Sequence, residues 1–517
     1  MKILSTLILY FSIIQITNAQ QKYWIEFTDK DQANYNYREN LSEKTIANRK
    51  LLNLPLVQFT DIPVKSEYIK KVQNNDIQIV NSSKWLNAST AYLNHEQIEW
   101  LKKQTFVKNV SPIKTMIVPL SMEVEESFIK NPKGVNYTTA ISQMEANLIM
   151  KAGFTGEGIT VGVIDAGFYN ADKNKFLKHL FNNKSILGSR DFVNPGEIDI
   201  ENLKTYSDGH GTKVLMRIAG RKGNASYFGM ATDAQFYLAR SEKGDSESRE
   251  EEDYWISAME WMDSLGVRII NTSLGYAVGF DDPSQNYKPE QMNGATAMIS
   301  KAAQIASDEK GILLVVSAGN EGSDPNWRIV SAPADAKGAL SVGATSNNGM
   351  KMGYSSIGPS SISYLKPNVS CYSMEGTSFS APVITGFAAC LMQAKPTVTN
   401  KELVEIIEKS CPLFPYGNNY IGYGVPKSSS ALKLLDGEEL NPTIKRKMVN
   451  GKGFINLKTD DRDEKEGVVF HKADQKLVNM QEVISGGKGK FKVSRPGDDI
   501  IQSTIIIGEE TFEIFWQ

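Results

Sequence analysis

Cysteine is scarce in this chain: its 517 residues include only three, Cys371, Cys390 and Cys411. At most one disulfide can form, which excludes a scaffold built on disulfides. Cys390 lies in the apolar run 383–392, and a reactive thiol needs an electropositive, accessible setting. We therefore expect Cys390 to be a small buried hydrophobic residue, and a cysteine-peptidase mechanism is disfavoured.

Neither sign of charge dominates, because 57 Lys and Arg residues oppose 59 Asp and Glu residues, for a formal net charge of -2. The totals therefore lack both the basic footprint of a nucleic-acid-binding protein and a polyanionic tail. We expect no nucleic-acid partner.

Long apolar runs are also missing beyond the first nineteen residues. Those residues start Met-Lys, continue in an apolar run from Ile3 to Ile16, and end Thr17-Asn18-Ala19 with a small residue at the expected cut. This pattern is typical of a signal peptide. The alternative is a membrane anchor, but the run is short of the roughly 20 apolar residues that span a bilayer. We expect a protein exported to the medium, the cell surface or the periplasm, with no membrane span after signal removal.

The region 20–118 reads as a small α+β module. Short β-like runs and helical runs follow one another in the order β-α-β-β-α-β, which predicts a ferredoxin-like fold. The expected strands are 23–27, 77–80, 89–92 and 106–110, and the expected helices are 67–72 and 96–103. The polar segment 119–136, with Asn131-Pro132-Lys133-Gly134, predicts an exposed linker.

The region 137–435 has a different pattern, in which apolar strands are followed by helices. This pattern predicts an α/β domain with a mostly parallel sheet and helices on both faces. The expected strands are 159–164, 235–239, 267–270, 312–316 and 339–342, and the expected helices are 212–218, 253–265, 295–307, 378–393 and 400–409. The remaining residues, 443–517, form short alternating runs that predict a small β domain of unknown role.

One of the four histidines stands in an unusual setting. His210 lies in Asp208-Gly209-His210-Gly211-Thr212, where the glycines allow close backbone approach and the following apolar residues have helical spacing. A histidine at the start of a helix in such a turn is well placed to act as a general base. The pattern alone is equally compatible with a structural role.

Asp165 directly follows the buried apolar run 159–164. A carboxylate at the end of a buried strand is costly unless it is paired. A helix cap or a metal ligand would explain it. Paired with a histidine, it would fix the tautomer and stabilise the imidazolium formed during proton transfer.

Ser378 lies in the run 376–382, which predicts the start of a helix and so places the serine among unpaired backbone N–H groups. The alternative is an ordinary serine N-cap. Asn320 follows the apolar run 312–316, and beside a nucleophilic serine its amide could donate to a developing oxyanion together with the Ser378 N–H.

These segments together resemble the subtilisin-like serine protease family, in its order Asp, His, Asn, Ser. The resemblance covers about 141–435 and rests on Val163-Ile164-Asp165-Ala166-Gly167, Asp208-Gly209-His210-Gly211-Thr212, Asn271-Thr272-Ser273-Leu274-Gly275, Ser317-Ala318-Gly319-Asn320 and Gly376-Thr377-Ser378-Phe379-Ser380-Ala381-Pro382. It implies a serine endopeptidase in which Asp165 orients His210, His210 deprotonates Ser378, and Ser378 forms the acyl-enzyme. Asn320 is implied as the oxyanion donor.

The resemblance also implies two walls of a substrate cleft. Ser273, Leu274 and Gly275 would form one wall and pair with an extended substrate, while Ala318 and Gly319 would form the other. These residues are small and uncharged, so we expect an uncharged, mostly apolar residue before the cut. The acidic run Glu247, Glu250, Glu251, Glu252 and Asp253 would either favour basic residues further along the substrate or form a solvated face.

The amino-terminal module resembles, in element order and position, the inhibitory propeptide of this family. It implies a zymogen that cuts itself between about 119 and 136, with proteins or peptides as substrates and its own propeptide as a partner. No cofactor is required; calcium is a common structural ion in the family, but no run of closely spaced carboxylates marks a site here. The alternative to an enzyme is a catalytically inactive, secreted binding protein with the same fold.

The chain departs from the family pattern in two places. Lys366-Pro367-Asn368 stands where an acid and an Ala-Pro-Gly turn are usual, and Lys213-Val214-Leu215-Met216-Arg217 follows His210 where small residues are usual. We expect a different loop shape at the first place and different packing behind the histidine at the second.

Overall fold

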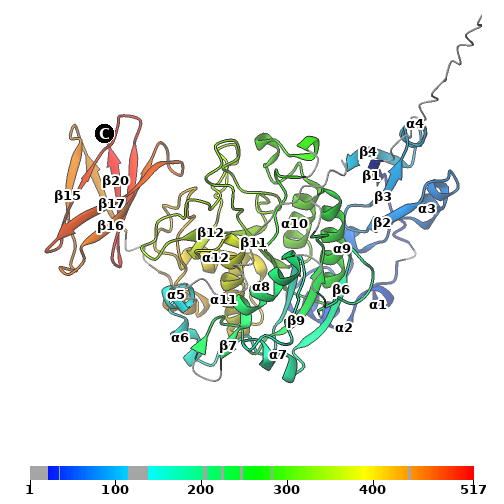
Figure 1. Ribbon diagram of the computed structural model, residues 1–517, viewed down its shortest axis with the longest axis horizontal. Coiled ribbons are helices and arrows are strands. Elements are labelled where there is room, and N and C mark those ends of the chain that lie inside the picture. Colours follow the sequence, from blue (N-terminus) through cyan, green and yellow to red (C-terminus); the bar gives the residue numbers. More distant parts are fainter. Residues whose placement is uncertain are drawn as a thin grey trace, which may run out of the picture.

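Three domains follow one another along the chain in the computed structural model, with the amino-terminal domain in blue, the central domain in cyan to yellow and the carboxy-terminal domain in orange to red (Figure 1). The structure describes residues 21–33, 35–113, 138–200, 202, 206–222, 226–244, 248–280, 283–440 and 444–517. The expected signal peptide 1–19, the linker 119–136 with its processing site, and Glu247 lie outside these residues.

The amino-terminal domain is a four-stranded antiparallel sheet in the order β2-β3-β1-β4, the strand order of a ferredoxin-like fold. Its strands are β1 (Gln21–Phe27), β2 (Ile79–Ser83), β3 (Ala88–Leu93) and β4 (Val107–Ile113). The expected helices correspond to α3 (Ser66–Gln73) and α4 (His95–Lys102). Two further helices, α1 (Tyr37–Asn40) and α2 (Glu43–Leu51), and the 3₁₀ turn η1 (Phe59–Asp61) were not predicted.

The central domain contains a seven-stranded sheet in the order β13-β12-β11-β10-β5-β9-β6, and every pairing is parallel. The strands are β5 (Thr160–Asp165), β6 (Ile186–Asp191), β9 (Gln235–Arg240), β10 (Ile269–Thr272), β11 (Leu313–Ser317), β12 (Ala339–Thr345) and β13 (Val369–Tyr372). The predicted parallel α/β sheet is confirmed. The two strands that the sequence did not reveal, β6 and β13, are the two edges.

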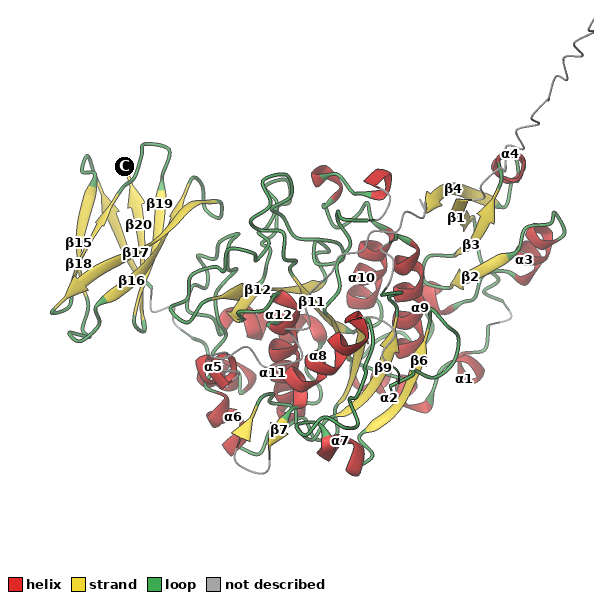
Figure 2. Cartoon of the chain, in the orientation of Figure 1, coloured by secondary structure: helices red, strands yellow, loops and turns green. Residues whose placement is uncertain are grey.

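Helices cover both faces of this sheet, as Figure 2 shows in red around the yellow strands. Successive residues of a strand point to opposite faces. Val161 and Val163 therefore pack in one core with α8 (His210–Ala219), α11 (Ala381–Ala394), α12 (Asn400–Lys409) and α13 (Ser428–Leu435). Ile164 and Ile270 pack in the other with α9 (Glu250–Ser264) and α10 (Met298–Asp308).

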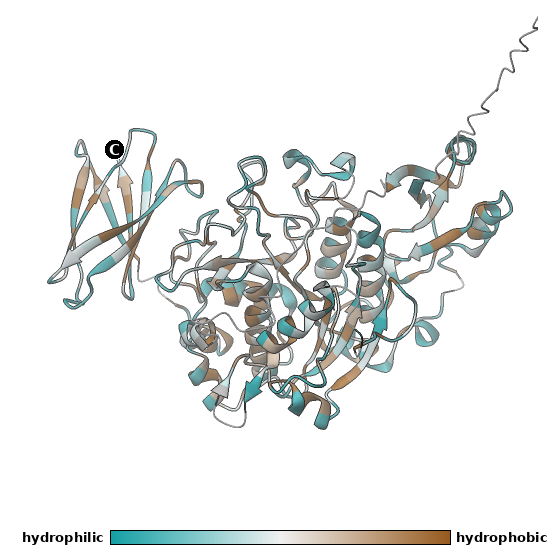
Figure 3. Cartoon of the chain, viewed as in Figure 1, coloured by the Kyte–Doolittle hydropathy of each residue, from teal (hydrophilic) through white to brown (hydrophobic). Residues whose placement is uncertain are grey.

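The central helix α11 is buried along almost its whole length, and Figure 3 shows the hydrophobic colour on it. Shorter elements complete the domain: α5 (Thr138–Gln143), α6 (Ala146–Lys151), α7 (Lys178–Asn182), β7 (Arg221–Lys222), β8 (Ser226–Tyr227), η3 (Tyr206–Gly209), η4 (Pro283–Gln285), η5 (Pro289–Gln291) and η6 (Thr377–Phe379). Of the helices in the described parts of the chain, none has the length and apolar character needed to cross a membrane.

The carboxy-terminal domain is a seven-stranded β structure in the order β14-β20-β19-β16-β17-β18-β15. Its strands are β14 (Lys445–Val449), β15 (Phe454–Lys458), β16 (Glu466–Lys472), β17 (Val478–Gly487), β18 (Lys490–Ser494), β19 (Gln502–Ile507) and β20 (Glu510–Trp516). The predicted carboxy-terminal β domain is confirmed. The pairing of β14 with β20 is parallel, and the other pairings are antiparallel.

The amino-terminal domain packs against α9 through one face of its sheet. Trp24 and Ala88 join the same core as α9 and α10, while Ile25 and Phe27, on the opposite face, pack against the domain's own helices. Asp253 of α9 accepts hydrogen bonds from Asn81 (2.9 Å) and Thr90 (2.8 Å) and pairs with the buried Lys22 Nζ at 2.9 Å. Glu260, two turns further along α9, accepts hydrogen bonds from the Ser83 hydroxyl (2.5 Å) and the Trp85 backbone N–H (3.1 Å).

The carboxy-terminal domain is attached to the opposite side of the central domain in Figure 1. Three residues of its strands, Val468, Phe470 and Val478, form one apolar cluster with Leu413, Tyr420 and Ile421 of the central domain. The side-chain amide of Gln481 on β17 bonds to both backbone groups of Lys351: it accepts from the N–H (2.9 Å) and donates to the carbonyl (3.0 Å). The Gln481 side chain thus forms the two hydrogen bonds that a paired strand residue would form, although the two residues are 130 positions apart.

Candidate active site

Asp165 and His210 meet where a strand ends and a helix begins. Asp165 is the last residue of β5 and His210 is the first of α8. The distance from His210 Nδ1 to Asp165 Oδ1 is 2.7 Å. The Asp165 side chain is fully buried, whereas the His210 side chain is 27% exposed. The imidazole is therefore tied to the carboxylate on one side and open on the other.

Two glycines allow this close approach. A Cβ at Gly211 would lie 2.5 Å from the Gly167 carbonyl oxygen and 3.0 Å from Asp165 Cβ, and a Cβ at Gly167 would lie 2.7 Å from Asp208 Cα. The Gly211 N–H instead donates to the Gly167 carbonyl at 2.9 Å. Larger residues at either position would push the helix that begins at His210 away from the end of β5.

Electrostatics favours protonation of His210. Burial acts to lower the pKa of His210, but the charge of Asp165 and its hydrogen bond outweigh burial and raise the pKa above its ordinary value, against a smaller opposing effect of Lys213. With a carboxylate accepting at Nδ1, the favoured neutral tautomer carries its proton there, which leaves Nε2 free to take a proton.

Ser378 does not open the long helix as predicted. It lies in the 3₁₀ turn η6, and α11 begins only at Ala381, so the predicted helix start at 378 is wrong by three residues. The reason is local: Phe379 N–H and Ser380 N–H bond three residues back, to Gly376 and Thr377. The Ser378 side chain is nearly buried, at 9% exposure for the residue.

The segment that follows β10 holds Ser378 in place from the other side. The Ser378 hydroxyl donates to the Ser273 carbonyl at 3.3 Å, and the Ser273 hydroxyl donates to the Ser378 carbonyl at 3.0 Å. That Ser273 is a wall of the cleft stays a prediction; the structure shows that Ser273 fixes the backbone of the serine turn.

Asn320 lies on the exposed turn after β11 and is joined to the same serine turn. Its Oδ1 accepts hydrogen bonds from the Thr377 N–H (2.9 Å) and the Thr377 hydroxyl (3.0 Å). Because the oxygen is used in this way, the Nδ2 end of the amide is the one left to donate. A Cβ at Gly376 would lie 3.5 Å from Nδ2, which places the amide against the backbone just before Ser378.

The two predicted walls of the cleft are separated by a residue that the sequence did not reveal. A Cβ at Gly275 would lie 2.1 Å from Ser331 Oγ, and a Cβ at Gly319 would lie 3.3 Å from the same oxygen. Tyr276 and Ala332 exchange backbone hydrogen bonds of 2.8 and 3.1 Å, which brings this segment alongside the wall. No motif surrounds Ser331, so only the fold shows it.

The acidic run at the start of α9 is not a solvated face. Glu250, Glu251, Glu252 and Asp253 are all buried. Glu250 accepts from the Tyr92 hydroxyl of the amino-terminal domain at 2.8 Å, as Asp253 accepts from Asn81 and Thr90. The solvated-face interpretation is therefore wrong for these four residues, because the amino-terminal domain and nearby loops cover them.

The first departure from the family pattern produces a buried cation. The Lys366 ammonium donates to the Ala339 carbonyl and to Asn368 Oδ1 (3.0 Å), and Asn368 Nδ2 donates to Glu408 Oε1 at 2.7 Å. Burial lowers the pKa of Lys366 to about 7, despite the attraction of Glu408 and Asp335. The loop is therefore held by a lysine and an asparagine instead of the usual turn.

The three cysteines are buried and unpaired, and burial raises the pKa of Cys371 to about 12. Within the described ranges, no group of three or more His, Cys, Asp or Glu side chains is arranged to hold a metal ion. The expectations about cofactors and calcium stay predictions.

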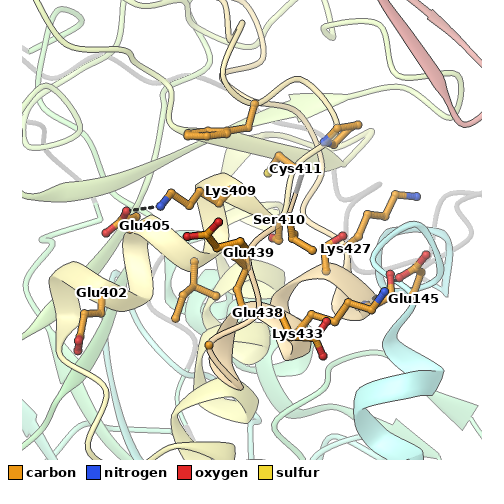
Figure 4. Close-up of a pocket in the computed structure, with 18 of the residues that line it drawn as sticks. Glu145, Glu402, Glu405, Lys409, Ser410, Cys411, Lys427, Lys433, Glu438 and Glu439 are labelled. Carbon is orange, nitrogen blue, oxygen red and sulfur yellow. Dashed lines mark hydrogen bonds and ion pairs between the residues drawn. The ribbon is translucent and has the colours of Figure 1, made fainter. Parts of the chain in front are cut away.

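A pocket of about 820 Å³ lies away from these residues, between α12, α13 and the segment that follows α13 (Figure 4). Glutamates and lysines alternate around it, among them the paired Glu405 and Lys409 at 2.5 Å. None of Asp165, His210, Asn320 and Ser378 lines this pocket, and its mixed charges favour no single class of ligand.

Comparisons with known proteins show which families the chain resembles. Residues 156–424, more than half of the chain, match the subtilase family, and residues 22–127 match the peptidase S8 propeptide domain of Bacteroidota. Subtilisin NAT of Bacillus subtilis subsp. natto is 27% identical over 354 residues, which cover 66% of this chain and 80% of that protein. The alkaline protease of Alkalihalobacillus alcalophilus is 25% identical over 393 residues, or 73% and 91% of the two chains.

Among solved structures, the epidermin leader peptide processing serine protease of Staphylococcus aureus has a TM-score of 0.53 at 15% identity. The match covers 82% of this chain and all of that chain. At this identity the likeness shows a shared fold.

Proposed function

This chain belongs to the subtilase family and is a serine endopeptidase, and on that premise we propose that it cleaves peptide bonds through an acyl-enzyme on Ser378. The observation that carries the proposal is the hydrogen bond of 2.7 Å between His210 Nδ1 and Asp165 Oδ1, with the remaining imidazole edge exposed. The ring of Phe379, the residue after the serine, lies 5.4 Å from the His210 ring, which brings the base next to the serine turn.

In the first step, the Ser378 oxygen bonds to the scissile carbonyl carbon while His210 Nε2 takes the hydroxyl proton. Asp165 stabilises the imidazolium. The carbon–nitrogen bond then breaks as His210 returns the proton to the leaving amine, and water hydrolyses the ester by the same route. The negative oxygen of the tetrahedral intermediate is bound by Asn320 Nδ2 and the Ser378 backbone N–H.

The substrate would lie as an extended strand along Ser273, Leu274 and Gly275, with Ala318 and Gly319 on the other side. Ser331 Oγ lies against Gly275 and close to Gly319, one residue of each proposed wall. We therefore expect a small, uncharged residue immediately before the cut. Mapping the cut sites in a peptide library tests this preference, and frequent cleavage after Arg, Lys or Trp would contradict it.

We further propose that the amino-terminal domain is the propeptide of a zymogen and that the chain is cut within 119–136. We propose that residues 1–19 direct export of the whole chain. The propeptide match over 22–127 and the docking of this domain on α9 support the zymogen. Amino-terminal sequencing of protein recovered from cells and from medium tests both the export and the cut.

The decisive test of catalysis is covalent labelling by a serine-directed reagent such as a sulfonyl fluoride. In wild type, the reagent should label Ser378 at the same rate as it inactivates the enzyme. Asn320→Ala should slow turnover by roughly 10²–10³-fold with little change in KM, as for this donor in subtilisin. An unlabelled protein would instead favour an inactive binding protein of the same fold.

We propose that the enzyme requires no cofactor and that calcium, if bound, has only a structural role. The same preparation tests this proposal. Chelation should leave the chemical step unchanged. A loss of kcat that added metal restores would contradict the proposal.

A further inference from the structure

The second departure from the family pattern lies directly behind the proposed base. Arg217 is on α8, two turns after His210, and so lies on the same side of the helix. Its Nη2 contacts Glu375 Oε2 at 3.2 Å. The side chains of Arg217 and Glu375 are only 7% and 11% exposed, so this is a largely desolvated ion pair.

Glu375 belongs to the turn that carries Ser378. It stands three residues before the serine, and the Ser373 hydroxyl closes the turn by donating to the Gly376 carbonyl at 2.7 Å. A displacement of Glu375 is therefore passed through a short, hydrogen-bonded turn to the nucleophile. The ion pair thus joins the helix of the base to the turn of the nucleophile.

Phe379 lies close to both Arg217 and His210. Its ring centroid lies 5.9 Å from the Arg217 guanidinium carbon and 5.4 Å from the His210 ring centroid. A guanidinium over an aromatic face is attracted to it, so Arg217 contacts the serine turn through both Glu375 and Phe379.

The two ends of α8 are already fixed by backbone contacts. At its start, Gly211 packs against Gly167, and near its end a Cβ on Gly386 of α11 would lie 2.8 Å from the Ile218 carbonyl. These contacts set the axis of α8 against the sheet and against α11. Neither of them reaches the turn that holds Ser378.

We propose that Arg217 and Glu375 are a positioning pair that sets the separation between the His210 imidazole and the Ser378 hydroxyl. The inference rests on the proposed function of Ser378 and His210 and adds two residues that touch neither substrate nor reacting atoms. An error of about 1 Å between reacting groups can slow a reaction by about 10²-fold. The pair therefore acts on the rate of acylation and leaves substrate binding unchanged.

Glu375 also faces a second cation. Lys213 lies on the turn of α8 between His210 and Arg217; burial lowers its pKa, Glu375 raises it and Arg217 lowers it further. Removing the carboxylate therefore leaves two cations facing each other. We expect Glu375→Gln to be more harmful than Arg217→Met.

The experiment is a double-mutant cycle with Arg217→Met, Glu375→Gln and the double variant, together with Arg217→Lys. Each variant is purified as the full chain and processed by a trace of wild-type enzyme. Three quantities are measured: kcat, KM and the limiting rate of Ser378 labelling by the sulfonyl fluoride. The control is Arg221→Met, just beyond α8, whose partner Asp233 is 3.7 Å away and partly exposed.

Each single variant should lower kcat and the labelling rate by 10- to 100-fold with KM changed less than threefold. The double variant should be no slower than Glu375→Gln alone, because the second change removes a partner that is already lost. Arg217→Lys should stay within about fivefold of wild type, since an ammonium can still pair but lacks the planar fork. Arg221→Met should match wild type in all three quantities.

Three results would overturn the proposal: wild-type labelling rates in both single variants, a rise in KM with kcat unchanged, or single effects that simply multiply in the double variant. A variant that fails to fold shows in its melting curve, and Arg217→Lys and the double variant then still decide the matter. If wild type itself is not labelled, the proposed function fails; if wild type is labelled and the variants react equally fast, only the pair fails.

Discussion

The two outer domains are attached to the same central domain by different chemistry. The amino-terminal interface has apolar contacts through Trp24 and Trp85, but it is distinguished by charge: the buried pairs of Lys22 with Asp253 and of Asp61 with Lys310 (2.6 Å), and the half-buried Glu260 bonded to the segment 83–85. The carboxy-terminal interface instead combines the apolar cluster around Phe470 with the neutral amide of Gln481. Its charged groups are at least partly exposed: Lys427 lies 3.9 Å from the exposed Glu509, and the half-buried Lys476 donates to the Ile362 carbonyl.

The Asp61 site shows how far charge is used in the amino-terminal interface. Burial acts to raise the pKa of Asp61, but Arg49 of its own domain and Lys310 of the central domain hold it at about 2. Asp61 and Lys310 are both fully buried while the domains are joined. Burying such charged groups costs free energy, and water solvates them well once the two domains separate.

The difference indicates which contact is built to be temporary. If the amino-terminal domain leaves, it uncovers charged side chains that water solvates beside the apolar surface that Trp24 and Trp85 cover, whereas loss of the carboxy-terminal domain would uncover the apolar residues Leu413, Tyr420 and Ile421. The first interface suits a domain that is removed and the second a domain that stays. Four changes test this comparison.

Ser378→Ala should have the largest effect, a loss of activity of roughly 10⁶-fold, as known for the nucleophile in subtilisin. Without self-cleavage, the amino-terminal domain should also stay covalently attached, so that both outer domains become permanent. Amino-terminal sequencing and the mass of the purified chain measure this. Normal processing in the variant would assign the cut to another protease.

Asp253→Ala should loosen only the amino-terminal domain. It leaves Lys22 buried without its carboxylate, which costs about 4 kcal/mol, or about 10³-fold in the dissociation constant of the cleaved domain. Recovery of activity on dilution of the processed complex measures this constant. Asp29→Ala, which removes an exposed pair with Lys65 inside the same domain, is the matched control.

Phe470→Ala should destabilise the junction with the carboxy-terminal domain by about 3 kcal/mol, because it removes a fully buried ring from the shared cluster. The midpoint of chemical unfolding should fall, and inhibition by the amino-terminal domain should not change. Phe454→Ala, at a ring that is 43% exposed, serves as the control. An unchanged midpoint would mean that the two domains are not coupled through this cluster.

Gln481→Ala should have the smallest effect, about 2 kcal/mol, since it leaves the Lys351 N–H and carbonyl without their partner. Limited proteolysis between the two domains measures the loosening. Asn479→Ala changes an exposed residue of the same strand that bonds only within its own domain, to Asp499. Equal proteolysis of the two variants would contradict a special role for Gln481.

The sequence predicts elements well where the signal is local. Helix α12 was predicted at its observed bounds because apolar residues recur at helical spacing, and the structure adds a capping box between Thr399 and Glu402. The partnership of Asp165 and His210 was implied by the resemblance to the subtilisin-like family, which rests in part on the short glycine-containing motif around each residue. The structure brings them together, and their catalytic roles stay predictions.

Features that depend on contacts between distant segments could not be predicted from the sequence. Helix α2 was missed because its buried residues, Thr45 and Arg49, are polar, and they are buried only through contacts with distant segments. The Thr45 hydroxyl, for example, donates to the Asp263 carbonyl 218 positions away at 3.0 Å. Arg217 and Glu375 are 158 positions apart, so composition and spacing could flag Arg217 as unusual but could not name its partner.

All three thiols of the molecule belong to the central domain, on β13, within α11 and just after α12. Because they are buried and their pKa values are raised, they react with alkylating reagents only when that domain opens. The outer domains contain no cysteine at all. The rate at which the chain takes up a thiol label therefore reports how often the central domain opens, with no labelling signal from either outer domain.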